Sequence, residues 1–70
     1  MKRVRVESAA IRSIGYDTEN KIMQVEFEDG GVYDYYNVPE RIYDTFLKTE
    51  SHGTFFHENV KDVFAFNRVF

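Results

Sequence analysis

The chain has 70 residues and a formal net charge of -3, from nine Lys and Arg against twelve Asp and Glu. It contains no cysteine, which removes disulfides and cysteine-ligated metals as supports for the fold, and its charge is unlike that of a generally basic nucleic-acid-binding domain. No apolar run forms a signal peptide or approaches the ~20 residues of a membrane span, so we expect one cytoplasmic domain with no membrane partner.

The core of such a short chain must be thin. A domain of this size buries only about 60% of the surface that its unfolded chain exposes. Five Tyr and seven Phe supply large rings, each able to bury roughly 150–250 Å². We expect these rings, with self-association as a further possible support, to replace disulfides and metals.

The N-terminal residues form a basic segment followed by the first strand. Residues 1–12 contain four basic side chains and one acidic side chain, a formal charge of +3, which is typical of a basic arm or of a solubilising terminus. We expect residues 1–7 either to fray or to extend an edge of the sheet. Residues 11–16 form a better strand, in which Gly15 either weakens the pairing or marks a close backbone approach. Residues 17–20 have turn chemistry, because Asp and Asn side chains bond their own backbone.

The clearest strand spans residues 22–28, where apolar and polar side chains alternate. Asp29, Gly30 and Gly31 follow, and the two glycines can supply the positive φ of a tight hairpin. Residues 32–36 must then return antiparallel to this strand. The minimal sheet is a three-stranded meander.

Two helices are expected after the meander. Pro39 suits the first position of a helix, where its missing N–H would have no partner, and apolar side chains recur at helical spacing to residue 48. Residues 50–53 break this helix, and Ser51 or Thr54 can cap a second one. The second helix should carry its apolar side chains on one side: Phe55, Phe56, Val60, Val63 and Phe64.

These elements predict an α+β fold in a single domain, residues 1–70. A small three-stranded antiparallel meander is followed by two helices packed on one of its faces, and the other face is left for water or a partner. The tail, residues 65–70, fits either more helix or a short extended segment laid against the domain.

An ordered set of short motifs runs along nearly the whole chain: Ser13-Ile14-Gly15-Tyr16-Asp17, Val25-Glu26-Phe27, Gly31-Val32-Tyr33-Asp34-Tyr35, Val38-Pro39 with Tyr43 and Phe46, Ser51-His52-Gly53-Thr54-Phe55-Phe56 and Asn59-Val60-Lys61. This set resembles the KTSC domain, which is named for its occurrence at the C-terminus of some lysyl-tRNA synthetases and also occurs as a free-standing protein. Two positions depart from the family pattern, with His57 in place of an asparagine and Ala65 in place of a proline. The resemblance implies a binding role, with RNA suggested as the ligand, and it does not imply an enzymatic site.

The Tyr-x-Tyr motif has two interpretations. Tyr33 and Tyr35 could form an exposed platform on which unpaired bases stack, each stack contributing roughly 1–3 kcal/mol. Alternatively, both rings lie under the helices and the hydroxyls reach the edge of the core. In the second case Asp34 lies on the opposite face, where it would repel a phosphate backbone. We therefore expect Tyr33, Tyr35 and Pro39 to be structural, and any binding surface to lie around residues 51–56.

Residues 51–56 are the candidate anion site. Ser51, His52 and Gly53 could place backbone N–H groups at a helix N-terminus, which favours a phosphate or carboxylate. The structural interpretation is that Ser51 caps the helix and Gly53 allows a tight approach, with Phe55 and Phe56 in the core. Nearby cations and one exposed ring complete the candidate nucleic-acid surface: Arg12, Lys48, Lys61, Arg68 and Tyr36.

No catalytic, cofactor or metal site is expected. His52 and His57 are five residues apart, which fits poorly with the i, i+4 spacing of two helical metal ligands. Ser51 and His52 lack the features of a nucleophile elbow or an oxyanion hole. The leading hypothesis is a non-enzymatic module that binds RNA. The alternative is a protein-interaction module or homodimer that uses exposed aromatic rings and an open strand edge.

Overall fold

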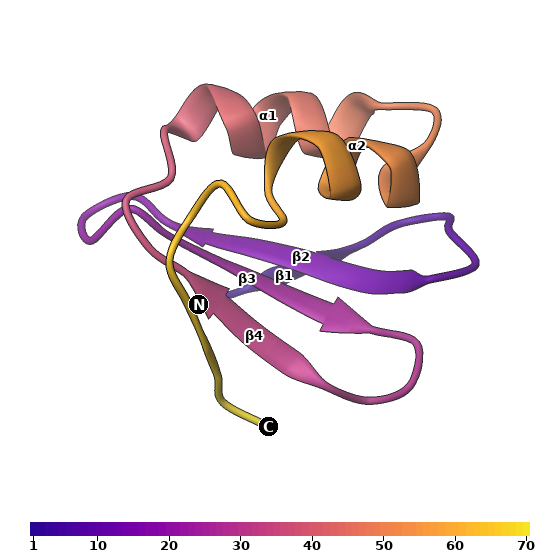
Figure 1. Ribbon diagram of the computed structural model, residues 1–70, viewed down its shortest axis with the longest axis horizontal. Coiled ribbons are helices and arrows are strands. Elements are labelled where there is room, and N and C mark those ends of the chain that lie inside the picture. The colour runs from indigo at the N-terminus through magenta and orange to yellow at the C-terminus, as the bar shows by residue number, and fades with distance from the viewer.

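The sheet has five strands, two more than the sequence predicted. The computed structural model describes residues 1–70, and the strands lie in the order β1-β2-β3-β4-β5, each antiparallel to its neighbours. Both helices lie on one face of this sheet (Figure 1), which confirms the α+β class and the one-sided helical layer. The bounds are β1 Arg3–Arg5, β2 Ile11–Asp17, β3 Ile22–Phe27, β4 Val32–Tyr35, α1 Glu40–Lys48, α2 His52–Asn59 and β5 Phe66–Arg68.

The two additional strands form the edges of the sheet. β1 pairs with β2, with Arg3 opposite Gly15, so the N-terminal segment extends an edge and does not fray. β5 pairs with β4, with Asn67 opposite Asp34, so the tail is extended and not helical. Each of these strands has three residues. Such a short run does not display enough alternation to identify a strand from the sequence.

The register places the Tyr-x-Tyr motif on the helix-covered face. Met23 lies opposite Tyr35 and Val25 lies opposite Tyr33, and side chains directly opposite each other share a face of the sheet. Tyr35 is buried within the core cluster, and Tyr33 is half-buried beside it. The structural interpretation of this motif is therefore confirmed for Tyr35, whereas Tyr33 lies at the margin of the core.

Both predicted hairpin turns form. Asp17 Oδ1 accepts hydrogen bonds from the backbone N–H groups of Glu19 and Asn20 at 3.0 and 3.2 Å. The Asn20 side chain donates to Asp17 Oδ2, and this bond is the largest cause of the lowered pKa of Asp17. In the second turn only Gly30 has a positive φ, 97°. The expectation that both glycines supply it was wrong.

The helices are shorter than expected at two ends. Pro39 is the N-cap of α1, with extended backbone, so the helix begins one residue after the predicted start. Ser51 is the N-cap of α2, which ends at Asn59. Residues 60–64, expected to be helical, form turns in which Asp62 has a φ of 63°. Neither helix has the length and hydropathy that crossing a membrane would require.

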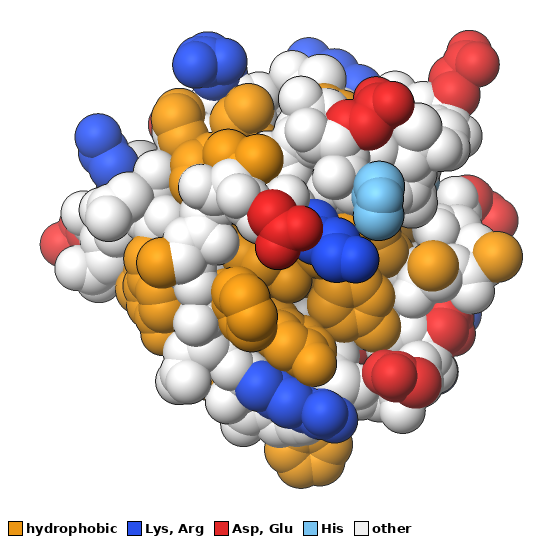
Figure 2. Space-filling model, in the orientation of Figure 1, with side chains coloured by type: hydrophobic (Ala, Val, Ile, Leu, Met, Phe, Trp, Pro, Cys, Tyr) orange, Lys and Arg blue, Asp and Glu red, His pale blue; other side chains and the backbone are white.

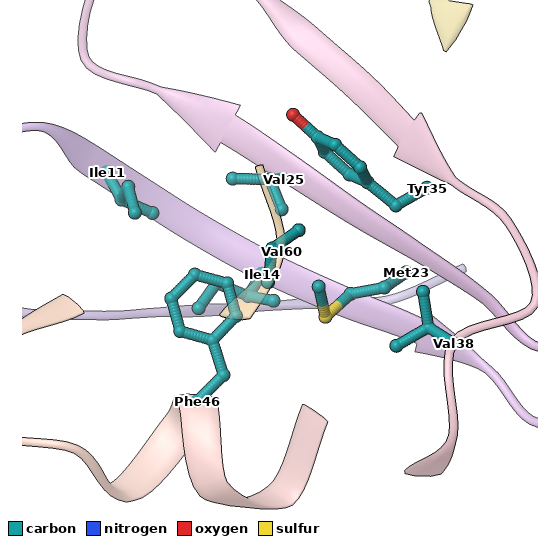
Figure 3. Close-up of a cluster of buried hydrophobic side chains, with 8 residues drawn as sticks. All are labelled: Ile11, Ile14, Met23, Val25, Tyr35, Val38, Phe46 and Val60. Atoms are coloured by element: carbon teal, nitrogen blue, oxygen red, sulfur yellow. The ribbon is translucent and has the colours of Figure 1, made fainter. Parts of the chain in front are cut away.

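The core lies between the helices and the sheet. Phe46 of α1 points toward the strands (Figure 3) and is fully buried, and its ring stacks on Phe55 with a centroid distance of 5.1 Å. At the other end of α1, the Tyr16 hydroxyl donates to the Val38 carbonyl at 2.5 Å. The eight buried apolar side chains of the cluster are Ile11, Ile14, Met23, Val25, Tyr35, Val38, Phe46 and Val60.

Candidate functional site

An apolar groove of about 560 Å³ opens beside α2. Figure 2 shows hydrophobic side chains gathered between α2 and the C-terminal segment, with charged side chains around them. Grooves of this size are typical of sites that bind a small molecule or a single protruding side chain. The lining residues come from β3, β4, β5, α2 and neighbouring loops: Ala10, Phe27, Glu28, Asp29, Tyr33, Tyr35, Phe56, Lys61, Asp62 and Phe66.

Five aromatic rings form the wall of the groove and contact one another. The rings of Tyr33 and Tyr35 stack with a centroid distance of 6.4 Å, and Phe66 lies 5.9 and 5.8 Å from these two rings. Phe27 and Phe56 meet edge to face at 5.2 Å. Mutual packing of this kind restricts ring rotation. The groove is therefore formed before any ligand arrives.

Charges of both signs surround the rings. Glu28, Asp29 and Asp62 line the groove together with Lys61. The Arg68 guanidinium lies 5.6 Å from the centre of the Tyr33 ring, in cation–π geometry. Three carboxylates against two cations give this rim a small negative charge. Such a rim suits a largely apolar ligand better than a phosphate chain.

Burial in the groove wall raises the pKa of the Tyr35 hydroxyl from 10.0 to about 12, with the nearby Tyr33 as a smaller cause. Between these two pH values the folded chain keeps a proton that the unfolded chain has lost. We expect the free energy of unfolding to fall as the pH rises through this window, because the folded state binds more protons. Urea unfolding of the native chain and Tyr35→Phe over this range checks the prediction. The prediction would be contradicted if the free energy of unfolding fell as steeply in Tyr35→Phe as in the native chain. A smaller slope should remain in the variant, because burial also raises the pKa values of Tyr16 and Tyr43.

The structure does not bring the predicted nucleic-acid-binding residues together. Arg12 forms ion pairs with Glu28 and Glu26 at 3.3 and 3.7 Å, so its guanidinium already has acidic partners. Lys48 is exposed in the last turn of α1, and Tyr36 follows β4 and is half-buried. Of the predicted cations, only Lys61 and Arg68 lie at the aromatic groove.

The start of α2 forms a separate hollow of about 500 Å³ with acidic surroundings. Glu7 and Glu50 are among its lining residues, and no Lys or Arg is. The Ser51 hydroxyl bonds the Thr54 hydroxyl at 2.8 Å and no backbone N–H of the helix, so the predicted side-chain cap does not form. A Cβ at Gly53 would meet nothing within 4 Å, which contradicts the expected tight approach.

His52 is buried with both ring nitrogens unpartnered. Each nitrogen is shielded from solvent, so neither can contact a ligand in this conformation. The ring lies 6.1 Å from that of Phe46 and contributes to the core. The structure therefore gives His52 a packing position where the sequence suggested an anion contact.

Replacing His52 by leucine is expected to stabilise the domain by about 1–2 kcal/mol. A buried polar group without a partner costs about that much free energy, and an apolar side chain of similar size removes the cost. Chemical unfolding of His52→Leu measures the gain. The matched control is His57→Leu, because His57 is exposed on the same helix and should change stability by less than about 0.5 kcal/mol. A loss of stability in His52→Leu would mean that the ring has a hydrogen-bond partner.

No group of three or more His, Asp or Glu side chains could bind a metal ion. Sequence reasoning missed Phe27 and Phe66 as parts of the site and expected the surface around residues 51–56. Only Phe56 of that segment lines the groove. The alternation of Phe64 and Phe66 was the one local signal, and it did not reveal that the tail lies beside Tyr33 and Tyr35.

Comparisons with known proteins agree with this architecture. A family model for the KTSC domain matches residues 7–64. The crystal structure of a KTSC domain protein from Yersinia pestis is 36% identical, has a TM-score of 0.95, and covers 99% of this chain and 97% of its own. An uncharacterized protein of Stutzerimonas stutzeri is 41% identical over 87% of this chain and 86% of its own length. A lysine–tRNA ligase of Nostoc punctiforme is 26% identical over 94% of this chain, which corresponds to 12% of the ligase.

Proposed function

This chain belongs to the KTSC domain family, and from that premise we propose that it is a small, non-catalytic protein-binding module. Its binding site is the aromatic groove, and the ligand is an apolar side chain projecting from a partner protein. The observation that carries this proposal is a wall of five rings around an open volume of about 560 Å³. The cytoplasmic location expected from the cysteine-free composition stays a prediction.

Apolar area and rigidity favour a protruding side chain as the ligand. Aromatic residues in desolvated pockets supply most of the binding energy at many protein interfaces. Phe56, Tyr33 and Tyr35 are fixed by their mutual contacts, so little ordering cost opposes binding. The carboxylates and cations of the rim can then bond polar groups that flank the ligand side chain.

Filling the groove from its β2 side tests this function. Ala10 is exposed and lines the groove, and its backbone carbonyl accepts a hydrogen bond from Glu28. Ala10→Phe keeps that bond and occupies the volume. The probe is N-acetylphenylalanine amide, and NMR titration measures its binding to the native chain. We expect about millimolar affinity and shifts of the Phe27, Tyr33 and Phe56 amides, all abolished in Ala10→Phe.

Ala9→Phe is the matched control, because Ala9 is also exposed and lines the hollow at α2, as Ala10 does, but does not line the groove. It should bind the probe like the native chain. Shifts confined to other surfaces, or shifts that persist in Ala10→Phe, would remove the groove from this role.

RNA is the second candidate ligand, because Arg68 and Lys61 lie at a groove of stacked rings and the chain is similar to part of lysine–tRNA ligases. Unpaired bases stack on aromatic side chains, and phosphate contacts make binding fall steeply with salt. A fluorescent single-stranded RNA pool titrated at low and physiological salt tests this ligand. Binding that weakens with salt and with Arg68→Ala would favour RNA, and absence of binding at low salt would exclude it.

A further inference from the structure

The apolar surface that remains exposed is concentrated at one edge of the sheet. Six large hydrophobic side chains are exposed, and four of them lie in the last eight residues: Val63, Phe66, Val69 and Phe70. Phe70 alone is 81% exposed. These residues surround β5, the strand that ends the sheet beyond β4. An apolar strand edge of this kind is a template for another strand.

The outer backbone groups of β5 are available for pairing. Tyr36 N–H donates to the Ala65 carbonyl and Val69 N–H donates to the Val32 carbonyl, so residues 65 and 69 face β4, as does Asn67 in the same register. Because hydrogen-bonding groups alternate between the two sides of an antiparallel strand, the N–H and C=O groups of Phe66 and Arg68 point away from the sheet.

Antiparallel pairing of this edge with a second copy can be centred on Asn67, which places Phe66 opposite Arg68 and Ala65 opposite Val69. We propose that β5 pairs antiparallel with β5 of a second copy, about a two-fold axis at Asn67, so that the two sheets form one continuous sheet in a homodimer.

This register satisfies the outward backbone groups and avoids like charges. Phe66 of one copy and Arg68 of the other exchange both backbone hydrogen bonds, and the ring lies beside the guanidinium, a favourable cross-strand pair. The exposed Phe70 follows β5, so in this register it comes near the residues that precede β5 of the second copy. A register centred on Arg68 would instead oppose two guanidinium groups. Only the register centred on Asn67 pairs every residue of the three-residue strand.

The opposite edge of the sheet lacks this complementarity. β1 has Arg3 and Arg5 among its three residues, and Lys2 precedes it. Two copies of such an edge would repel each other, which is a common protection against edge pairing. The contrast between a basic edge at β1 and an apolar edge at β5 favours a closed two-fold dimer over an open chain of copies.

The dimer uses the outward backbone groups of β5, whereas the groove lies on the face of the sheet, although the ring of Phe66 belongs to both the groove wall and β5. Ala10→Phe, which fills the groove, should therefore leave the dimer unchanged. If Ala10→Phe loses probe binding but still dimerises, the result supports the groove proposal alone. If the native chain is monomeric but binds the probe, only the dimer is overturned.

Amide hydrogen exchange gives the sharpest test, combined with sedimentation velocity over a range of concentrations. In the monomer the Asn67 amide, which faces β4, should be more protected than the Phe66 and Arg68 amides. The Phe66 and Arg68 amides should become protected only as the sedimentation coefficient rises from monomer to dimer. A monomer at the highest concentration, or fast exchange of these two amides in the dimer, would overturn the proposal.

Two substitutions at Arg68 distinguish the contribution of its backbone N–H to dimerisation from that of its guanidinium. Arg68→Pro removes the outward N–H without removing a hydrogen bond to β4, a position where edge strands accept proline, and should abolish the dimer. Arg68→Ala removes only the cation and should weaken association about two- to fivefold. Equal dimerisation of the two variants would assign the contact to another surface.

Phe70→Glu covers the case in which Arg68→Pro does not fold, because so exposed a side chain contributes little to the monomer. It replaces an apolar ring next to the dimer contact by a carboxylate and should leave a folded monomer. A dimer of native affinity in this variant would contradict the register.

Discussion

Phe46→Ala is expected to lower the free energy of unfolding by about 3–5 kcal/mol, the range for a fully buried phenylalanine. The total stability of a 70-residue domain is only about 4–10 kcal/mol. The ring is fully buried and contacts Phe55, Phe56 and His52 with centroid distances of 5.1, 6.4 and 6.1 Å.

Urea unfolding followed by circular dichroism measures this loss. Val63→Ala is the control, because Val63 is 59% exposed and its truncation should change stability by less than about 0.5 kcal/mol. A loss below about 1.5 kcal/mol for Phe46→Ala would mean that α1 moves inward to close the cavity. The core would then be more adaptable than its packing indicates.

Adding one methyl group at Gly15 should have the next largest effect. A Cβ there would lie 2.9 Å from the backbone oxygen of Lys2 and 2.9 Å from Arg3 Cγ. Gly15→Ala therefore pushes β1 away from β2, and overpacking of this kind costs about 1–3 kcal/mol. The displacement also strains the bonds that Arg3 donates to Ser13 and Gln24 at 3.0 and 2.6 Å. Thermal unfolding, with amide exchange at Arg3 and Arg5, measures both effects.

Replacing Gly53 by alanine should instead raise the free energy of unfolding. Nothing lies within 4 Å of a Cβ at this position, which is inside α2, and alanine stabilises a helix by up to about 1 kcal/mol over glycine. The free energies of unfolding of Gly15→Ala and Gly53→Ala should thus differ by about 1–4 kcal/mol. Equal effects of the two changes would show that the close approach of β1 does not constrain the sheet.

Local patterns predicted the central meander and α1 within one or two residues. The alternation at 22–28 and the turn side chain of Asp17 act over a few positions, and a sequence displays such signals directly. The close approach at Gly15 was one of two stated alternatives, and the distances confirm it. The Tyr-x-Tyr motif was placed under the helices because a thin core needs aromatic rings, and Tyr35 lies there.

Properties that depend on distant segments could not be predicted in the same way. β5 pairs with β4 across both helices, and β1, although it pairs with the next strand in the chain, has only three residues, which alone specify no pairing. The groove combines Phe27, Phe56 and Phe66 from three separate elements. His52 occupies a sequence context typical of a helix start, and only the packing of α2 against Phe46 buries its ring.

The order of the strands in the sheet equals their order in the chain, which has a consequence for how the domain folds. The first three pairings join strands that are adjacent in sequence, so they close short loops and can form early. The pairing of β4 with β5 must wait until both helices have been placed between them. We expect this pairing to form last and open first, on a faster timescale than global unfolding. In a monomer, the terminal strand would then detach and rejoin while the remaining four strands stay folded.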